Sequence, residues 1–234
     1  MDNTSYTLST IAAGSLVIAG ICCAIIVIDI LAGHRQSMRI MNFVYPITAL
    51  YAGVLSLLFY YTIGRRSTEE AVMKAKEQGQ EPPGKTKPFW QSVAVGALHC
   101  GSGCTVGDII SEALLYFFPL VLFGMKLYGA WAVDYVIAFS AGILFQYYSI
   151  KPMKNLSPKE GIKAALKADT LSLTFWQIGM YGWMAIATFL IFGHELKADS
   201  PVFWLMMQIC MLFGFVTAYP INWWLLKKKI KEIM

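Results

Sequence analysis

Charged residues are scarce in this chain. They make up 14% of its 234 residues, whereas hydrophobic residues make up 57% and the mean hydropathy is +0.55. Such a composition excludes an ordinary soluble domain. Runs of about 20 apolar residues, the length that crosses a hydrocarbon core, recur so often that no stretch remains for a separate soluble domain. We expect an all-α polytopic membrane helical bundle that forms a single integral membrane domain over residues 1–234.

Other absences narrow the function. The first 32 residues contain no Lys or Arg, so the positive n-region of a cleaved signal peptide is missing and the first apolar run is expected to be a retained span. No basic patch lies away from the membrane-flanking segments, which argues against nucleic acid as a partner. The chain has only three histidines, and just one falls in the middle of a predicted span, which disfavours a haem protein.

About six transmembrane helices are predicted, and the third is anomalous. They lie near residues 10–32, 40–64, 89–124, 127–150, 170–193 and 202–226. The 36 residues of the third span would run about 54 Å as one straight helix, which is too long for one crossing. Gly101, Gly103 and Gly107 lie in its middle. We therefore expect this helix to be long and broken or kinked near 101–107.

The segment before the fifth span carries a helix-start signal. Ser157-Pro158-Lys159-Glu160 is a capping box with proline at the first helical position. Ile162, Ala165 and Leu166 then recur at helical spacing. Lysines follow one another at four-residue intervals, at positions 159, 163 and 167. This pattern predicts an amphipathic helix over 157–169 that lies on the membrane surface.

The distribution of Lys and Arg predicts the orientation. The segments 65–88, 151–169 and 227–234 hold fifteen of the nineteen basic residues, and six spans would place these three segments on one side. The positive-inside rule then puts both termini in the cytoplasm. We expect a multi-pass protein of the cell (inner or plasma) membrane.

A run of ten residues inside the third span carries the clearest chemical signal. It reads His99-Cys100-Gly-Ser-Gly-Cys104-Thr-Val-Gly-Asp108. A bilayer interior penalises imidazole and carboxylate groups unless they meet a partner, an ion or water. Thiol, imidazole and carboxylate are also ligands of transition metals. On a helix, Cys100, Cys104 and Asp108 would follow one another at four-residue intervals along one stripe.

Methionines add soft donors to this signal. Met180 and Met184 are four residues apart, as are Met207 and Met211, so each pair faces one direction on its helix. Thioethers and thiols suit Cu(I), and a ladder of them would lead the ion to the cysteines. The competing interpretation is that methionines fill gaps, buried cysteines act as small apolar residues and glycines allow close helix packing. The predicted metal-site residues are His99, Cys100, Cys104, Asp108, Met180, Met184, Met207 and Met211.

The ten-residue run resembles the hallmark of a prokaryotic family of small membrane proteins, catalogued as a domain of unknown function with a His-Cys-Gly motif. Further similar stretches lie at residues 168–172, 177–180, 206–208 and 219–224, and a weaker one at 45–51. The resemblance covers about 90–226, with 40–64 as an extension. The family implies no activity, so function must be argued from the chemistry of the residues.

Three functions remain open. The first is a membrane protein that binds Cu(I) and handles or transports it. The second is a membrane thiol–disulfide oxidoreductase using Cys100 and Cys104, although their spacing is not that of the common Cys-x-x-Cys redox motif. The third is a proton-coupled transporter of a small solute. Its carriers would be the carboxylates Asp29, Asp108, Glu112, Asp134 and Asp169.

We favour the copper protein, with copper as Cu(I) the expected ligand and the lipid bilayer and a metal ion the expected partners. This interpretation leans away from an enzyme without excluding one. The sequence leaves the oligomeric state open and allows a homo-oligomer.

Overall fold

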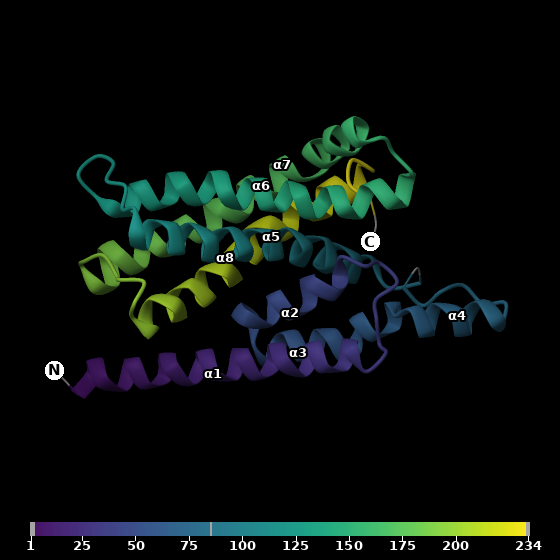
Figure 1. The fold of residues 1–234 in the computed structure, drawn as a ribbon, viewed down its shortest axis with the longest axis horizontal. Helices are drawn as coiled ribbons and strands as arrows, with labels where there is room; N and C mark the ends of the chain where they lie inside the picture. Colours follow the sequence, from purple (N-terminus) through teal and green to yellow (C-terminus); the bar gives the residue numbers. More distant parts are fainter. Residues whose placement is uncertain (1–2, 85, 233–234) are drawn as a thin grey trace.

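A computed structural model describes residues 3–84 and 86–232, and among these residues it contains helices and no β-strand (Figure 1). Five described helices are long and apolar enough to cross a membrane. They are α1 (Asn3–Leu31), α5 (Phe89–Phe117), α6 (Lys126–Lys154), α7 (Pro158–Ala185) with its π-helical continuation η2 (Ile186–Phe192), and α8 (Pro201–Lys227). The predicted class, a helical membrane protein, is confirmed.

Helix α5 is the centre of the bundle. In the most apolar 18-residue window of α5, 83% is buried. The corresponding windows of α1 and α6 are each only 22% buried. It packs against α2, α6, α7 and α8, and α7 packs along α8. The outer face of α1 exposes large apolar side chains such as Ile11, Val17 and Ile28, as expected of a surface that faces lipid.

The predicted span 40–64 is not one helix. It forms α2 (Met41–Ala52) and α3 (Val54–Thr62), which double back on each other at Gly53 (Figure 1). Gly53 has φ +50°, a backbone conformation that glycine adopts readily. The two ends of the hairpin meet, because Ser37 N donates to Ser67 O at 2.9 Å. The prediction of a single helix here is wrong, and the segment is a helical hairpin.

An ion pair fixes the open end of this hairpin to α1. Arg65 donates to both carboxylate oxygens of Asp29, at 2.7 and 3.0 Å, and the Tyr60 hydroxyl donates to the same carboxylate at 2.7 Å. Residues 64–67 form the short helix η1 (Gly64–Ser67), and α4 (Glu69–Glu77) follows. The connections on both sides of the hairpin therefore lie at the same end of the molecule.

Helix α5 is continuous, and the expected break near 101–107 is absent. The glycines there allow close helix packing. A Cβ at Gly101 would collide with the Trp176 ring, and a Cβ at Gly103 would lie 2.5 Å from the Cα of Gly142. A Cβ at Gly107 would meet the backbone of Ala138. The excess length disappears because α5 ends at Phe117, before Pro119.

The predicted capping box is present at the start of α7. Ser157 N donates to Glu160 Oε2 at 3.1 Å, and Pro158 is the first helical residue. The helix does not stop at 169, however, but runs on to Ala185. The expected surface helix over 157–169 is thus the beginning of the fifth predicted span, since nothing in 166–172 breaks the helix.

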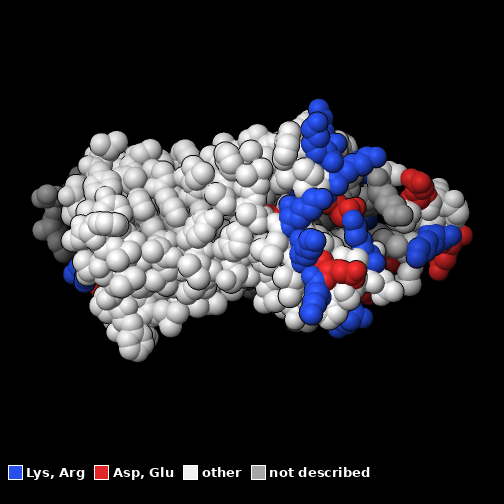
Figure 2. Space-filling model, turned by 90° about the horizontal axis from the view of Figure 1, so that it is seen from above, with Lys and Arg blue, Asp and Glu red and all other residues white. Residues whose placement is uncertain are grey.

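The start of α1 lies at one end of the long axis, whereas the C-terminus lies in the other half, on the side that carries α4 (Figure 1). Lys and Arg gather toward the end that carries α4 and the C-terminus (Figure 2), which we call the basic end. Lys126 and Lys197 lie instead in the connections at the other end. The hairpin also returns to the basic end. The prediction that both termini are cytoplasmic rests on six crossings and stays a prediction.

Candidate functional site

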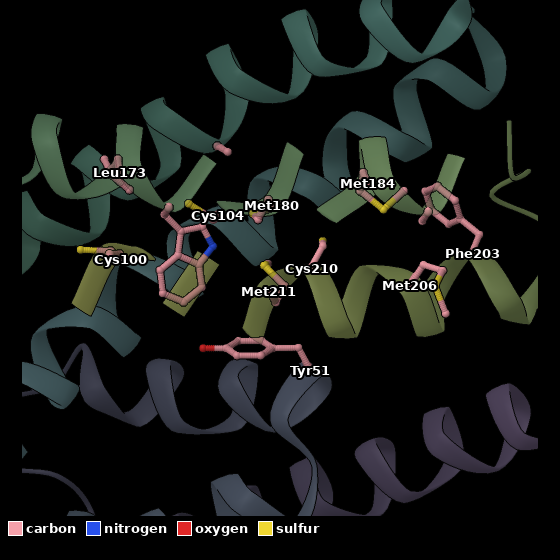
Figure 3. Packing of buried hydrophobic residues seen from close by; sticks show 14 residues of the cluster. Tyr51, Cys100, Cys104, Leu173, Met180, Met184, Phe203, Met206, Cys210 and Met211 are labelled. Carbon is pink, nitrogen blue, oxygen red and sulfur yellow. The ribbon is translucent and has the colours of Figure 1, made fainter. Parts of the chain in front are cut away.

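Sulfur atoms line the core between α5, α7 and α8. All belong to one buried cluster, in which Figure 3 shows Cys100 on one side, with its sulfur pointing away from the others, and Met206 on the opposite side. We call this set the sulfur row. Its members are Cys100, Cys104, Met180, Met184, Met206, Cys210 and Met211. All five cysteines of the chain are free thiols.

Helical spacing builds the sulfur row. The four-residue interval in α5 puts Cys100 and Cys104 on one face, and both are fully buried. The same interval places Met180 above Met184 in α7, and Met211 above Met207 in α8. Met207 packs against the cluster and accepts a contact from the Cys210 thiol at 3.8 Å, sulfur to sulfur. Five of the eight predicted metal-site residues thus belong to one cluster, and Met207 lies beside it.

A cavity of about 440 Å³ lies at the end of the molecule away from the basic end. Met180, Met184 and Met207 line it together with Asp134 and other acidic and aromatic residues. The acidic residues among its walls are Glu112, Asp134, Glu195 and Asp199. Two basic residues, Lys126 and Lys197, line it as well. The cavity therefore combines an excess of acidic over basic residues with soft thioether donors.

His99 lies apart from the sulfur row. Its Nε2 is 2.9 Å from the hydroxyl of Ser149 in α6, and its ring packs edge-on against Phe145. The Ser149 hydroxyl also lies 3.7 Å from the sulfur of Met38. Because consecutive residues on a helix point about 100° apart, His99 faces α6 while Cys100 faces α7.

Asp108 also lies outside the sulfur row, in a buried carboxyl cluster. Asp134 accepts hydrogen bonds from Ser111 at 3.0 Å and from the Tyr181 hydroxyl at 2.9 Å. The carboxyl of Asp108 lies beside that of Asp134. Neither carboxylate oxygen of Asp108 has a hydrogen-bond partner among the described residues. This cluster borders the cavity through Asp134.

A polar cage at the basic end was not predicted. The ammonium of Lys231 forms an ion pair with Asp169 and lies 3.0 Å from Cys100 Sγ, 2.9 Å from Asn222 Oδ1 and 3.1 Å from Gly96 O. Both side chains of the ion pair are fully buried. We call this group, with Ser172, the lysine cage.

The cage is connected by further hydrogen bonds. Cys100 Sγ lies 3.1 Å from Ser172 Oγ and donates to Asp169 Oδ1 at 3.3 Å. Asn222 Nδ2 donates to Ser172 Oγ at 2.6 Å. Burial alone would lower the pKa of Lys231, but the negative charge of Asp169 and the nearby Cys100 raise this pKa above its ordinary value. Lys231 is therefore a charged ammonium inside the protein.

Among the described residues, no three His, Cys, Asp or Glu side chains come close enough together to hold a metal ion. Methionine sulfurs and amide or backbone oxygens are further donors, and that statement does not include them. A soft ion held by two or three sulfur atoms does not require such a group, because Cu(I) accepts thiol and thioether ligands.

Fold and site together define a helical membrane protein with a sulfur-lined core closed at one end by a buried lysine. The chain belongs to the family of a domain of unknown function, DUF4396, whose model matches residues 89–231. The resemblance inferred from the sequence is thereby confirmed. The match runs from the first residue of α5 to Lys231, so it includes the sulfur row and the lysine cage. No curated protein and no solved structure matches the chain.

Proposed function

We propose that this protein handles Cu(I) and carries it along the sulfur row. The observation that supports this most is the burial of seven sulfur-bearing side chains from three helices in one cluster. A monovalent soft ion exchanges readily between thioether and thiol ligands, and two or three sulfur atoms satisfy it at each position. Such a row lets the ion advance without losing all its ligands at once.

The cavity would be the mouth of this route. Four acidic and two basic residues line it, and an excess of one charge raises the local concentration of the opposite ion. Met180, Met184 and Met207 in its wall then offer the first sulfur ligands. The type of donor is the stronger of the two arguments for a soft cation, because thioethers suit such an ion.

Binding at the cysteines requires a base. A thiol must lose its proton to become the metal ligand. Cys100 donates to Asp169, and Asp108 lies one turn past Cys104 in α5, near Asp134 of α6. In this proposal Asp108 acts as a proton acceptor and not as a ligand.

We also propose that the basic end lies in the cytoplasm of the cell membrane. Apart from Lys126 and Lys197, the described Lys and Arg residues lie in or beside segments at that end, and the positive-inside rule assigns such an end to the cytoplasm. The C-terminus would then be cytoplasmic, and the start of α1 and the cavity would lie on the other face.

A binding measurement tests the copper proposal. Protein purified anaerobically with Cu(I) should retain the ion, and the double variant Cys100→Ser, Cys104→Ser should lose about a hundredfold in affinity, or about 2.7 kcal/mol. The matched control is Cys22→Ser, Cys23→Ser in α1, which removes two thiols outside the sulfur row. Wild-type protein that retains no copper would refute the proposal.

One observation favours a second candidate, a proton-coupled transporter. Both carboxylate oxygens of Asp108 are buried without a hydrogen-bond partner among the described residues, and buried carboxylates in membrane proteins often relay protons. In that case Asp108→Asn and Asp134→Asn would abolish activity, whereas the cysteine variants would not. Copper that the wild type retains and the cysteine variant loses favours the copper protein, whereas a wild type that retains no copper favours the proton-coupled transporter.

A further inference from the structure

The end of the chain turns back into the bundle. Helix α8 ends at Lys227, and Lys229 has φ +55°, a left-handed conformation that reverses the chain. Ile230 N then donates to Leu225 O at 3.0 Å. The next residues are held from two sides, because Lys231 enters the lysine cage and Glu232 pairs with Lys154 of α6 at 2.6 Å. The tail therefore closes the basic end of the bundle.

The lysine cage has the donors of a site for a monovalent cation. A carboxylate, an amide oxygen, a backbone oxygen and a thiol surround the ammonium, and they come from α5, α7 and α8. Asp169 Oδ2 is buried and has no hydrogen-bond partner among the described residues. The cage thus has an unused acceptor besides those that Lys231 already engages.

Cys100 belongs to both the sulfur row and the cage. An ion that follows the row toward the basic end therefore meets Lys231 at its last sulfur ligand. We propose that Lys231 is a tethered cation that closes this end of the route and occupies the site into which a monovalent metal ion passes from Cys100. The identity of the ion as Cu(I) rests on the proposed function, whereas the closing role of the tail does not.

The hydrogen bonds suggest how arrival of the ion would open the tail. When Cu(I) binds Cys100, the copper–sulfur bond forms and the S–H bond breaks, with the proton released to water. The arriving ion then lies beside the Lys231 ammonium, which is 3.0 Å from the same sulfur, and two adjacent cations repel each other. The ammonium is displaced to water, and the carboxylate, amide and backbone oxygens that it engaged become free for the ion.

The test measures access to Cys100 with N-ethylmaleimide, the labelled residue being identified by mass spectrometry of the full chain. We expect Lys231→Met and a chain ending after Lys228 to react at Cys100 at least about tenfold faster than the wild type. Loss of the ammonium removes a charge that favours the reactive thiolate, so a faster reaction comes from better access. The matched control is Lys228→Met, which removes an exposed charge from the same tail.

A further variant distinguishes opening of the tail from loss of the folded structure. Lys231→Met leaves Asp169 unpaired, whereas Lys231→Met with Asp169→Asn removes both charges of the buried pair. Faster labelling of Cys100 in this double variant, with an unchanged elution profile, supports the closing role. Labelling at the wild-type rate in both the double variant and the shortened chain overturns it. Copper is not needed for this measurement, so faster labelling in a protein that binds no Cu(I) would reject the copper proposal alone.

Discussion

At the scale of single residues, the methionines separate the copper proposal from simple packing. A methionine that only fills space can be replaced by leucine, because volume-conserving swaps in a core usually cost less than about 1.5 kcal/mol. A methionine that binds Cu(I) cannot be replaced in that way, since leucine has no donor atom. Stability and affinity therefore respond differently to the same change.

We predict that Met180→Leu with Met184→Leu keeps the melting temperature within a few degrees of the wild type and weakens Cu(I) binding at least about tenfold, or about 1.4 kcal/mol. Thermal unfolding in detergent and competition with a Cu(I) chelator measure the two quantities. Met73→Leu in α4, where the side chain is exposed, is the control. An affinity equal to that of the wild type would mean that these methionines only pack.

The buried ammonium predicts a pH dependence of stability. Because the folded-state pKa of Lys231 is raised, its contribution is fully present below the ordinary lysine pKa of about 10.4 and is lost as the pH rises through the folded-state value. Between pH 9 and 12 the wild type should lose more stability than Lys231→Met with Asp169→Asn, which has no charged pair there. Unfolding curves at several pH values measure this difference, and parallel loss in the two proteins would contradict it.

The sequence predicted part of the site, and the direction of single side chains and one long-range contact explain what it missed. It placed Cys100 and Cys104 with the methionines, because four-residue spacing puts side chains on one helix face. It grouped His99 with them because the residues are adjacent, although adjacent helical positions point in different directions. Lys231 could not be found, since it reaches Cys100 only through a turn that joins positions 131 residues apart.

At the scale of the elements, the glycines of α5 determine how closely the helices approach. Gly103 faces Gly142 of α6, so backbone meets backbone there. Ser102 adds a hydrogen bond at 3.1 Å to Val44 O of α2. Several members of the ten-residue run thus hold neighbouring helices, which explains why a chemically unusual sequence forms a continuous helix.

Two glycine substitutions test this packing. Gly103→Ala should destabilise the protein by about 1–3 kcal/mol, because the new methyl group forces the α6 backbone away. Gly182→Ala should be neutral or stabilise by up to about 1 kcal/mol, since that helical position has open space around it and alanine favours a helix. Thermal unfolding of both variants checks the contrast. Equal stability of the two would show that α5 and α6 do not pack as described.

The hairpin shows a limit of hydropathy at this scale. Residues 40–64 form a run long enough for one crossing, and both arms are apolar, so composition does not reveal the turn. Gly53 was the available signal, but a glycine within an apolar helix is common in membrane proteins. Only the contacts between residues 35–37 and 67–69 show that the chain comes back to its starting end.

At the scale of the whole molecule, the hairpin changes the topology. In the orientation that we propose, five crossings would place the start of α1 and the C-terminus on opposite faces of the membrane. The loop at 32–40 then joins the basic end, which strengthens the charge asymmetry that the sequence already showed.

Labelling of single added cysteines checks this topology. Tyr6→Cys and Lys228→Cys should react with a membrane-impermeant maleimide from opposite sides of intact cells, with position 228 protected until the cells are opened. Ser37→Cys should behave as position 228 does. Reaction of positions 6 and 228 from the same side would restore the topology of six crossings.

The central claim, that sulfur atoms of this core carry Cu(I), is tested most directly by X-ray absorption at the copper edge. Full-length protein loaded with Cu(I) under anaerobic conditions should show sulfur as the only near neighbour of copper, and this signal should disappear in Cys100→Ser with Cys104→Ser. Scattering typical of imidazole would place His99 on the metal and contradict the sulfur row. Absence of bound copper would end the copper proposal.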